Sequence, residues 1–332
     1  MSKMRAFILA EILLVLTIVG AVFLYMNRGE EASEGLTRYQ PIYIDGPALL
    51  NLTETLSSDA LEGRETGTEG NAAARGFILK RFETMNLRRI GDAYAHEFAI
   101  IPYETGEVSL PALGVNLLGW VAGDTPGEGP MIVVTAHYDH LGIRDGEIYN
   151  GADDNAGGVA ALIGVADYFR RNPPAHDIVF AALDAEEKGM LGARDLVKSG
   201  LIDRDRIALN INFDMVSRSE TGELYAAGTA PYPQLKPLVT ELAAEAPVTV
   251  LMGHDTPELG PDDWTSQSDH VAFHEAGIPF LYFGVEDHPA YHQPTDDYTG
   301  LTHDFFVRSG DTLVMAVKAA DRWISRPDTA GN

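Results

Sequence analysis

Carboxylate and imidazole side chains follow directly after several apolar runs of this sequence. The side chains at these positions are His137 and Asp139, Glu186 and Glu187, and Asp214, and a later apolar run leads into a loop that carries His288 and His292. A further polar cluster, Gly151–Asn155, contains two aspartates and opens a predicted helix. The chain has no cysteine, so a metal site could use only nitrogen and oxygen ligands. The residue types therefore point to metal-dependent chemistry and exclude thiol chemistry.

A mixture of imidazoles and carboxylates suits zinc or another borderline divalent cation. Several carboxylates in one crevice repel one another unless a positive charge lies among them. A carboxylate that bridges two ions makes a co-catalytic site, which activates a water molecule and polarises a carbonyl group. One member of an adjacent glutamate pair can then bind metal while the other stays free as a general base. His137 and Asp139 have the pattern of a ligand and the carboxylate that orients it.

Each motif taken singly has a simpler structural explanation. A histidine after a strand is commonly a hydrogen-bonded loop residue. Asp153–Asn155 could cap a helix N-terminus by accepting hydrogen bonds from its free amides. Glu186 and Glu187 could form a solvated first helical turn, which the helix dipole favours. The metal interpretation requires the motifs to meet at one place, so it depends on the fold.

Short apolar runs alternate with helical patterns beyond residue 45. The predicted buried strands are Val115–Val121, Met131–Ala136, Ile178–Leu183, Ile207–Phe213 and Pro279–Phe283. The predicted helices are Pro47–Ser57, Thr68–Met85, Asn155–Arg171, Met190–Ser199, Gln234–Ala244 and Leu301–Ser325. This alternation predicts a three-layer α/β fold, in which helices cover both faces of a mixed, mostly parallel sheet. Ligands bind beyond the carboxyl ends of the strands in such a sheet, and the polar motifs lie there.

The composition is that of a globular protein, with 45% apolar and 22% charged residues among 332. Acidic side chains number 49 against 24 basic ones, which gives a net charge of −25. A chain this acidic has no electrostatic attraction to nucleic acid, so we expect no nucleic-acid partner. The lack of cysteine also excludes disulfides.

The N-terminal segment Ala6–Met26 is apolar apart from Glu11 and Thr17. Its 21 residues are close to the roughly 20 that a membrane-spanning helix needs. Lys3 and Arg5 precede it, and acidic residues follow it. The positive-inside rule therefore places the N-terminus in the cytoplasm and the rest of the chain outside, in the periplasm or the extracellular space.

We expect residues 1–27 to be a retained single-pass membrane anchor, followed by a linker at 28–45, one folded domain at 46–326 and a tail at 327–332. A cleaved signal segment is the main alternative, and cleavage would make the protein a secreted one. A type IV prepilin leader is a further alternative, suggested by Phe7 and Glu11, although such leaders carry glycine where Ala6 stands. All three alternatives place the folded domain outside the cytoplasm.

Several motifs occur along roughly residues 46–325: Leu61–Asn71 (LEGRETGTEGN), Ala136–Gly142 (AHYDHLG), Gly151–Gly158 (GADDNAGG), Ala185–Glu187 (AEE), Asn212–Met215 (NFDM), Ser268–His270 (SDH) and Tyr291–Asp297 (YHQPTDD). These motifs resemble those of the co-catalytic zinc aminopeptidases, a family of metallopeptidases that includes bacterial leucyl aminopeptidases and glutamate carboxypeptidase-like and glutaminyl cyclase-like branches. They stand in the order found in the family. The resemblance implies a zinc-dependent exopeptidase, an aminopeptidase acting on peptide substrates.

The resemblance also implies a role for each matching residue. The five implied metal ligands are His137, Asp154, Glu187, Asp214 and His292. Asp154 would bridge two zinc ions, with His137 and Asp214 at the first ion and Glu187 and His292 at the second. Glu186 would be the catalytic general base, and Asp139 the partner that orients His137. No ligand role carries over to His140, His270 or His288, which we expect to be supporting or loop histidines, and we expect Arg64 to close the loop before the helix at Thr68.

Rival functions remain for the same fold. A glutaminyl cyclase-like acyltransferase would use a single zinc ion, whereas the five implied ligands favour two. A non-enzymatic cell-surface binding module would be expected to lack a ligand or the base, and none is missing. Other peptidases of the clan insert a dimerisation domain, but the interval between Asp214 and His292 leaves no room for about 100 further residues. We expect the loops Tyr225–Tyr232 and Met252–Gln267 to line the substrate pocket.

Overall fold

The computed structural model of the protein describes residues 39–100 and 112–325. The strands are β1 (Arg88–Arg89), β2 (Ala95–Ile100), β3 (Ala112–Val121), β4 (Met131–His137), β5 (Gly142–Arg144), β6 (Glu147–Tyr149), β7 (Asp177–Leu183), β8 (Ile207–Phe213), β9 (Glu223–Ala227), β10 (Thr249–Met252) and β11 (Phe280–Gly284). The α-helices are α2 (Gly46–Leu56), α3 (Glu69–Met85), α4 (Gly158–Arg171), α5 (Leu191–Lys198), α6 (Lys236–Glu245), α7 (His270–Glu275) and α8 (His303–Ile324). The predicted anchor Ala6–Met26 and the predicted tail lie outside the described residues.

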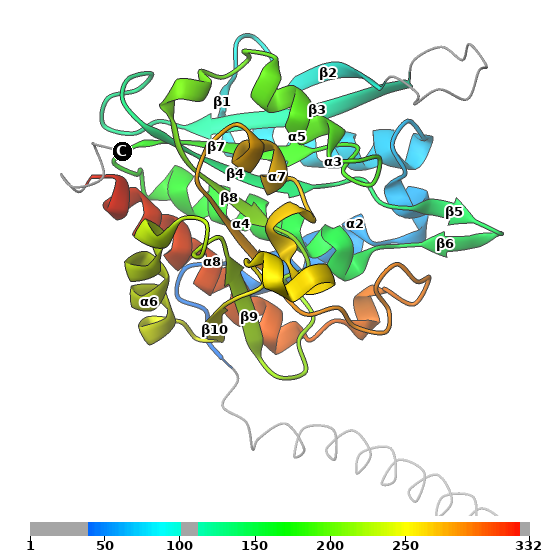
Figure 1. The fold of residues 1–332 in the computed structure, drawn as a ribbon. Helices are drawn as coiled ribbons and strands as arrows, with labels where there is room; N and C mark the ends of the chain where they lie inside the picture. Colours follow the sequence, from blue (N-terminus) through cyan, green and yellow to red (C-terminus); the bar gives the residue numbers. More distant parts are fainter. Residues whose placement is uncertain (1–38, 101–111, 326–332) are drawn as a thin grey trace, which may run out of the picture. The chain divides into compact units, whose positions relative to one another are not determined.

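Nine of the described strands form one mixed sheet (Figure 1). Its order is β1-β3-β7-β4-β8-β11-β9-β10, and β2 pairs with β3. The central strands β7, β4, β8 and β11 are parallel to one another, whereas β3 and β9 pair antiparallel with this centre. The predicted α/β class with a mixed central sheet is confirmed. The parallel part is its centre, where the site motifs lie.

The sheet is the middle one of three layers. Ile132 and Val134 of β4 belong to one apolar core, which α2, α3, α4, α6 and α8 cover. Met131 and Val133 of the same strand belong to a second core, which α5 and α7 cover. Both faces of the central strands are therefore buried, which explains why β4 and β7 are continuous apolar runs.

Short polar signals set several of the helix boundaries. The Asp45 carboxylate accepts a hydrogen bond from the Ala48 amide at the start of α2, and the Thr68 hydroxyl accepts one from the Asn71 amide at the start of α3. α4 begins at Gly158, three residues later than predicted. The preceding residues 152–157 form a kinked turn, in which Asp154 and Asn155 have non-helical backbone angles.

The segment before α2 is fixed to the last helix. The Asp311 carboxylate on α8 accepts hydrogen bonds from the amides of Ile42, Tyr43 and Ile44. The end of the predicted linker is therefore held against the folded domain. Among the residues that the structure describes, no helix has both the length and the apolar character needed to cross a membrane.

Candidate metal centre

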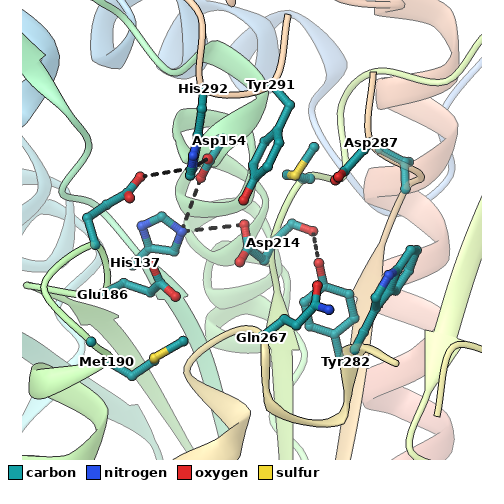
Figure 2. A pocket seen from close by; sticks show the side chains of 15 residues that line it. His137, Asp154, Glu186, Met190, Asp214, Gln267, Tyr282, Asp287, Tyr291 and His292 are labelled. Atoms are coloured by element: carbon teal, nitrogen blue, oxygen red, sulfur yellow. Dashed lines mark hydrogen bonds and ion pairs between the residues drawn. The ribbon is translucent and has the colours of Figure 1, made fainter. Parts of the chain in front are cut away.

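The carboxyl ends of the central strands bring the predicted site residues together (Figure 2). His137 is the last residue of β4, and Asp214 directly follows β8. The Glu186–Glu187 pair lies in the turn after β7. Asp154 comes from the kinked turn before α4, and His292 from the loop after β11. Segments far apart in the sequence therefore meet in one crevice.

His137 contacts two of the carboxylates. Its Nε2 atom lies 3.3 Å from Asp154 Oδ1 and 3.4 Å from Asp214 Oδ1, and all three side chains are buried. Its Nδ1 atom lies 3.1 Å from the backbone carbonyl oxygen of Asp139, whereas the Asp139 carboxylate is 3.7 Å away. Donation from Nδ1 to the carbonyl oxygen would leave Nε2 as the ligand atom.

Asp154 faces a second group of donors with its other oxygen. Its Oδ2 atom lies 3.1 Å from His292 Nε2, and the same nitrogen lies 3.7 Å from Glu187 Oε1. His140 Nδ1 is also present, 2.8 Å from Glu187 Oε1 and 3.8 Å from Asp154 Oδ2. The Asp154 carboxylate therefore lies between two groups of donors, which is the position that a bridging ligand requires.

The geometry and chemistry of these atoms fit zinc. Four zinc ligands at about 2.0–2.1 Å in a tetrahedron lie about 3.3 Å from one another. The separations given above among the five predicted ligands are 3.1–3.7 Å, which is near this value. Within the described part of the chain, Glu187 Oε1 and Asp214 Oδ1 are buried and have no hydrogen-bond partner. Buried carboxylate oxygens are rarely left in this state, so the site has free oxygen donors for cations.

The charges in the cluster are unevenly distributed. Burial lowers the pKa of His137, but the Asp214 and Asp154 carboxylates outweigh this effect and raise it well above its ordinary value. Burial alone would raise the pKa of Asp154, but the imidazoles of His140, His137 and His292 hold it well below its usual range. The surrounding imidazoles therefore favour the ionised form of Asp154.

Asp139 fixes the turn that carries the glutamate pair. Its Oδ1 atom accepts a hydrogen bond from the Glu186 amide at 3.0 Å, and its Oδ2 atom accepts one from the Glu187 amide at 3.2 Å. Thr66 also donates its hydroxyl to Oδ2. Glu186 and Glu187 do not form a solvated first helical turn, because α5 begins only at Leu191 and their amides are bound by Asp139.

Asp154 is held through its backbone and its neighbours. The Asp296 carboxylate accepts hydrogen bonds from the amides of Asp153 and Asp154. The Asp153 carboxylate accepts hydrogen bonds from the amide and the hydroxyl of Ser217, and lies 3.0 Å from His288 Nε2. Of the predicted capping residues, only Asn155 caps, because its side-chain oxygen accepts the Gly158 amide.

Asp214 is oriented by a chain of buried hydrogen bonds. The Ser268 hydroxyl donates to Asp214 Oδ2 at 2.7 Å, and Asn212 donates to the Ser268 hydroxyl oxygen. Thr135 donates to Asn212 in turn. Only one Asp214 oxygen is used in this way, so Oδ1 remains directed at His137. The SDH and NFDM motifs of the sequence therefore lie beside each other.

The remaining singled-out residues divide into two groups. His288 supports Asp153, and His270 Nε2 lies 2.8 Å from the Trp264 carbonyl oxygen, so both are supporting residues as expected. His140 differs, because it lies inside the second group of donors. Sequence reasoning missed this proximity, although its place three residues after His137, directly beyond the same strand, was an available signal.

An open pocket of about 310 Å³ leads to the cluster. Its apolar lining residues are Met190, Met215, Trp264, Tyr282, Val285 and Tyr291. Trp264 and Gln267 belong to the predicted pocket loop Met252–Gln267, whereas no residue of Tyr225–Tyr232 lines this pocket. Asp287 and Tyr291 come from the loop that also carries His292.

Comparisons with known proteins agree with this architecture. The model of peptidase family M28 matches residues 116–317. Aminopeptidase YwaD of Bacillus subtilis is 31% identical over 209 residues, which cover 60% of this chain and 43% of the relative. A probable zinc metalloprotease of Pyrenophora tritici-repentis is 28% identical over 282 residues, which cover 75% of this chain and 63% of the relative. The chain thus spans about half the length of the curated relatives it matches.

Solved structures share the fold at low sequence identity. BSAP, a zinc aminopeptidase from Bacillus subtilis, superimposes with a TM-score of 0.67 at 18% identity, over 85% of this chain and 96% of that one. A glutaminyl cyclase from Bacteroides thetaiotaomicron gives a TM-score of 0.64 at 17% identity, over 84% of this chain and 99% of the cyclase chain. The fold is therefore common to hydrolases and a cyclase. The family model covers more than half of the chain, including all five predicted ligands, and the chain belongs to peptidase family M28.

Proposed function

We propose that the protein is a zinc-dependent aminopeptidase that uses two zinc ions. The observation that carries this proposal is the Asp154 carboxylate, whose two oxygens face separate groups of donors. His137 and Asp214 would hold the first zinc ion with Asp154, and Glu187 and His292 would hold the second. When bound, the zinc ions would polarise the scissile carbonyl group and lower the pKa of a water molecule.

Glu186 is the group proposed to move protons. Its side chain lines the pocket beside the cluster, and it is not among the groups of potential metal ligands in the described chain. Burial raises the pKa of Glu186 well above its ordinary value, and Asp269 and Asp214 add to this effect although His137 opposes it. A carboxylate with a raised pKa is suited to accept a proton from water and to donate it to the leaving amine.

The charge of the pocket favours a free amino terminus as the substrate group. Five acidic residues line it: Asp154, Glu186, Glu187, Asp214 and Asp287. None of its described lining residues is lysine or arginine. A carboxypeptidase needs a cation to bind the carboxylate at the C-terminus of its substrate. The proposed zinc ions would occupy Asp154, Glu187 and Asp214, so Glu186 and Asp287 are the carboxylates left to attract an ammonium group. The apolar side chains nearby would contact the first side chain of a peptide.

A single-zinc glutaminyl cyclase is the second candidate, because a solved cyclase shares this fold. The free Oδ1 atom of Asp214 is directed at His137, so these two residues and Asp154 could hold one ion. Glu187 and His292 could hold another with Asp154, which favours two ions over the single ion of a cyclase. A non-enzymatic binding module has no observation in its favour, since the donors and Glu186 are all in place.

Metal content and substrate range test the proposal together. Elemental analysis should give two zinc ions per chain, and the protein should release p-nitroaniline from aminoacyl p-nitroanilides. The matched N-acetylated substrates should be resistant, because they have no ammonium group. Equal hydrolysis of free and acetylated substrates would contradict an aminopeptidase, and cyclisation of N-terminal glutamine with a single bound ion would favour the cyclase.

We also propose that residues 1–27 anchor the enzyme in a membrane, with the catalytic domain on the outer face. This rests on the apolar run Ala6–Met26 and the basic residues before it. Cell fractionation with added protease tests it. The domain should be in the membrane fraction and should be digested in cells with a permeabilised outer barrier, and a protected cytosolic domain would contradict the proposal.

A further inference from the structure

His140 has an environment that ordinary packing does not explain. It lies three residues beyond the end of β4, and its side chain is fully buried. Within the described residues, neither ring nitrogen has a hydrogen-bond partner. A buried imidazole with both nitrogens unpartnered is costly, because burial removes the hydrogen bonds that water would supply. The position therefore calls for a partner that the side chains do not provide.

The contact between His140 and Glu187 indicates what that partner is. His140 Nδ1 lies 2.8 Å from Glu187 Oε1, yet neither atom makes an aligned hydrogen bond. Two donor atoms that approach this closely without pointing at each other can both point at a third position. Asp154 Oδ2 lies 3.8 Å from the same Nδ1 atom, so three donor atoms surround that position.

The ring of His140 is also held in place. A Cβ atom on Gly151 would lie 2.5 Å from Cδ2 of the ring, so only glycine allows the close contact between this backbone and the imidazole. The His140 amide donates to the carbonyl oxygen of Arg64. The guanidinium of Arg64 in turn binds the carbonyl oxygens of Tyr138 and Gly151. A rigid support of this kind is what a preorganised ligand requires.

We propose that His140 Nδ1 is a direct ligand of the second metal ion, together with Asp154, Glu187 and His292. The inference rests on the proposed two-metal function. It makes the two sites unequal, with three protein ligands at the first ion and four at the second. The second ion would then be the more firmly held of the two, and the first would have more room for solvent and substrate. His140 would thus set the difference between the ions.

A spectroscopic experiment on the intact protein tests ligation directly. The metal-free full chain, labelled uniformly with ¹³C and ¹⁵N, is loaded with ¹¹³Cd, and the histidine ring resonances are assigned by through-bond correlation to their own backbone resonances. We expect two ¹¹³Cd signals, one of which couples to the ring nitrogens of both His140 and His292. A His140 signal without coupling, beside coupled His137 and His292 signals, would overturn the inference and leave the two-metal function standing. A single ¹¹³Cd signal would instead overturn the two-metal function, and this inference with it.

Metal titration supplies a second readout. In competition with a chelator, His140→Gln should leave the metal affinity of one site unchanged and lower that of the other. The loss should exceed about 10–100-fold, which is the effect of removing a residue that contacts a ligand but not the metal. His96→Gln is the matched control, because His96 lies on β2 and its ring nitrogen contacts the backbone carbonyl oxygen of Ala93, away from the predicted ligands. It should bind both ions as the parent chain does. Equal affinities in His140→Gln and the parent chain would contradict the inference, and the cadmium experiment decides it should the variant not fold.

Discussion

Glu186 and Glu187 are adjacent in the sequence but have different surroundings. Glu187 directs Oε1 at His140 and His292, whereas Glu186 lines the pocket outside both donor groups. Asp139 binds the two backbone amides and so holds the pair in this arrangement. One short turn therefore gives the two neighbours different surroundings, as the proposed difference in their roles requires.

The first prediction concerns Glu186. Glu186→Gln keeps the size of the side chain and removes its basic oxygen, so it should retain both metal ions. Its kcat should fall by about 10²–10⁴, the usual contribution of a general base, with a smaller effect on KM. Steady-state kinetics together with elemental analysis measure this. Normal turnover by the variant would show that the base is another group.

The second prediction concerns Glu187. Glu187→Gln replaces an anionic donor with a neutral one, so it should lower the affinity of one metal site while the other stays filled. Excess zinc in the assay should restore part of the activity, whereas it should not rescue Glu186→Gln. Chelator competition measures the affinity, and a variant that holds both ions as tightly as the parent would refute the assignment of Glu187 as a ligand.

At the scale of elements, Arg64 joins the segments that surround the site. Its guanidinium is buried and donates to the carbonyl oxygens of Leu56, Tyr138, Asn150 and Gly151. These oxygens belong to the end of α2, the residue after β4 and the turn before Asp154. Burial lowers the pKa of Arg64 to about 10, with the nearby Asp154 and Asp296 opposing this effect, so it stays charged at neutral pH. The sequence predicts that Arg64 closes one loop, whereas in the structure its guanidinium binds carbonyl oxygens of three separate segments.

The third prediction follows from these contacts. Arg64→Met keeps much of the apolar stem but leaves four carbonyl oxygens without their donor. The free energy of unfolding of the metal-free protein should fall by about 3–5 kcal/mol, since several buried acceptors lose their partner together. Arg64→Lys should recover only part of this, because one ammonium group lacks the planar fork. Urea unfolding measures both variants, and a loss below about 1 kcal/mol for Arg64→Met would contradict this role.

The sequence predicts the central elements well and the outer ones poorly. β8 has the predicted bounds, and β4 and β7 each differ by one residue, because strands buried on both faces are unbroken apolar runs. The short outer strands β2, β9 and β10 were not predicted, since half-exposed strands lack such runs. The start of α4 was misplaced because the turn at Asp154 uses side-chain contacts from distant loops, which local patterns do not contain.

The same division holds within the site. The motifs at strand ends identified the donors that the structure brings together, because parallel strands present their carboxyl ends at one edge. The Ser268–Asp214 contact and the place of His140 depend on how loops pack over that edge. Such contacts are tertiary, so neither composition nor spacing could determine them.

At the scale of the whole molecule, the apolar cores and the candidate metal site consist of different residues. The two largest cores lie on either face of the sheet, and neither includes a predicted ligand. The fourth prediction is that a chelator abolishes activity but leaves the far-ultraviolet circular dichroism nearly unchanged. The Tm should fall on chelation, since ions that bind only the folded state stabilise it by about 2.7 kcal/mol at 100 times Kd. Collapse of the secondary structure on chelation would contradict this separation.

The central claim is that Asp154 bridges two zinc ions, and anomalous diffraction at the zinc absorption edge tests it most directly. Crystals of the zinc-loaded protein should contain two anomalous peaks at this site. One peak should lie among His137, Asp154 and Asp214, and the other among Asp154, Glu187 and His292. A single peak with Asp214 bound to no ion, or two peaks that Asp154 does not contact, would contradict the claim.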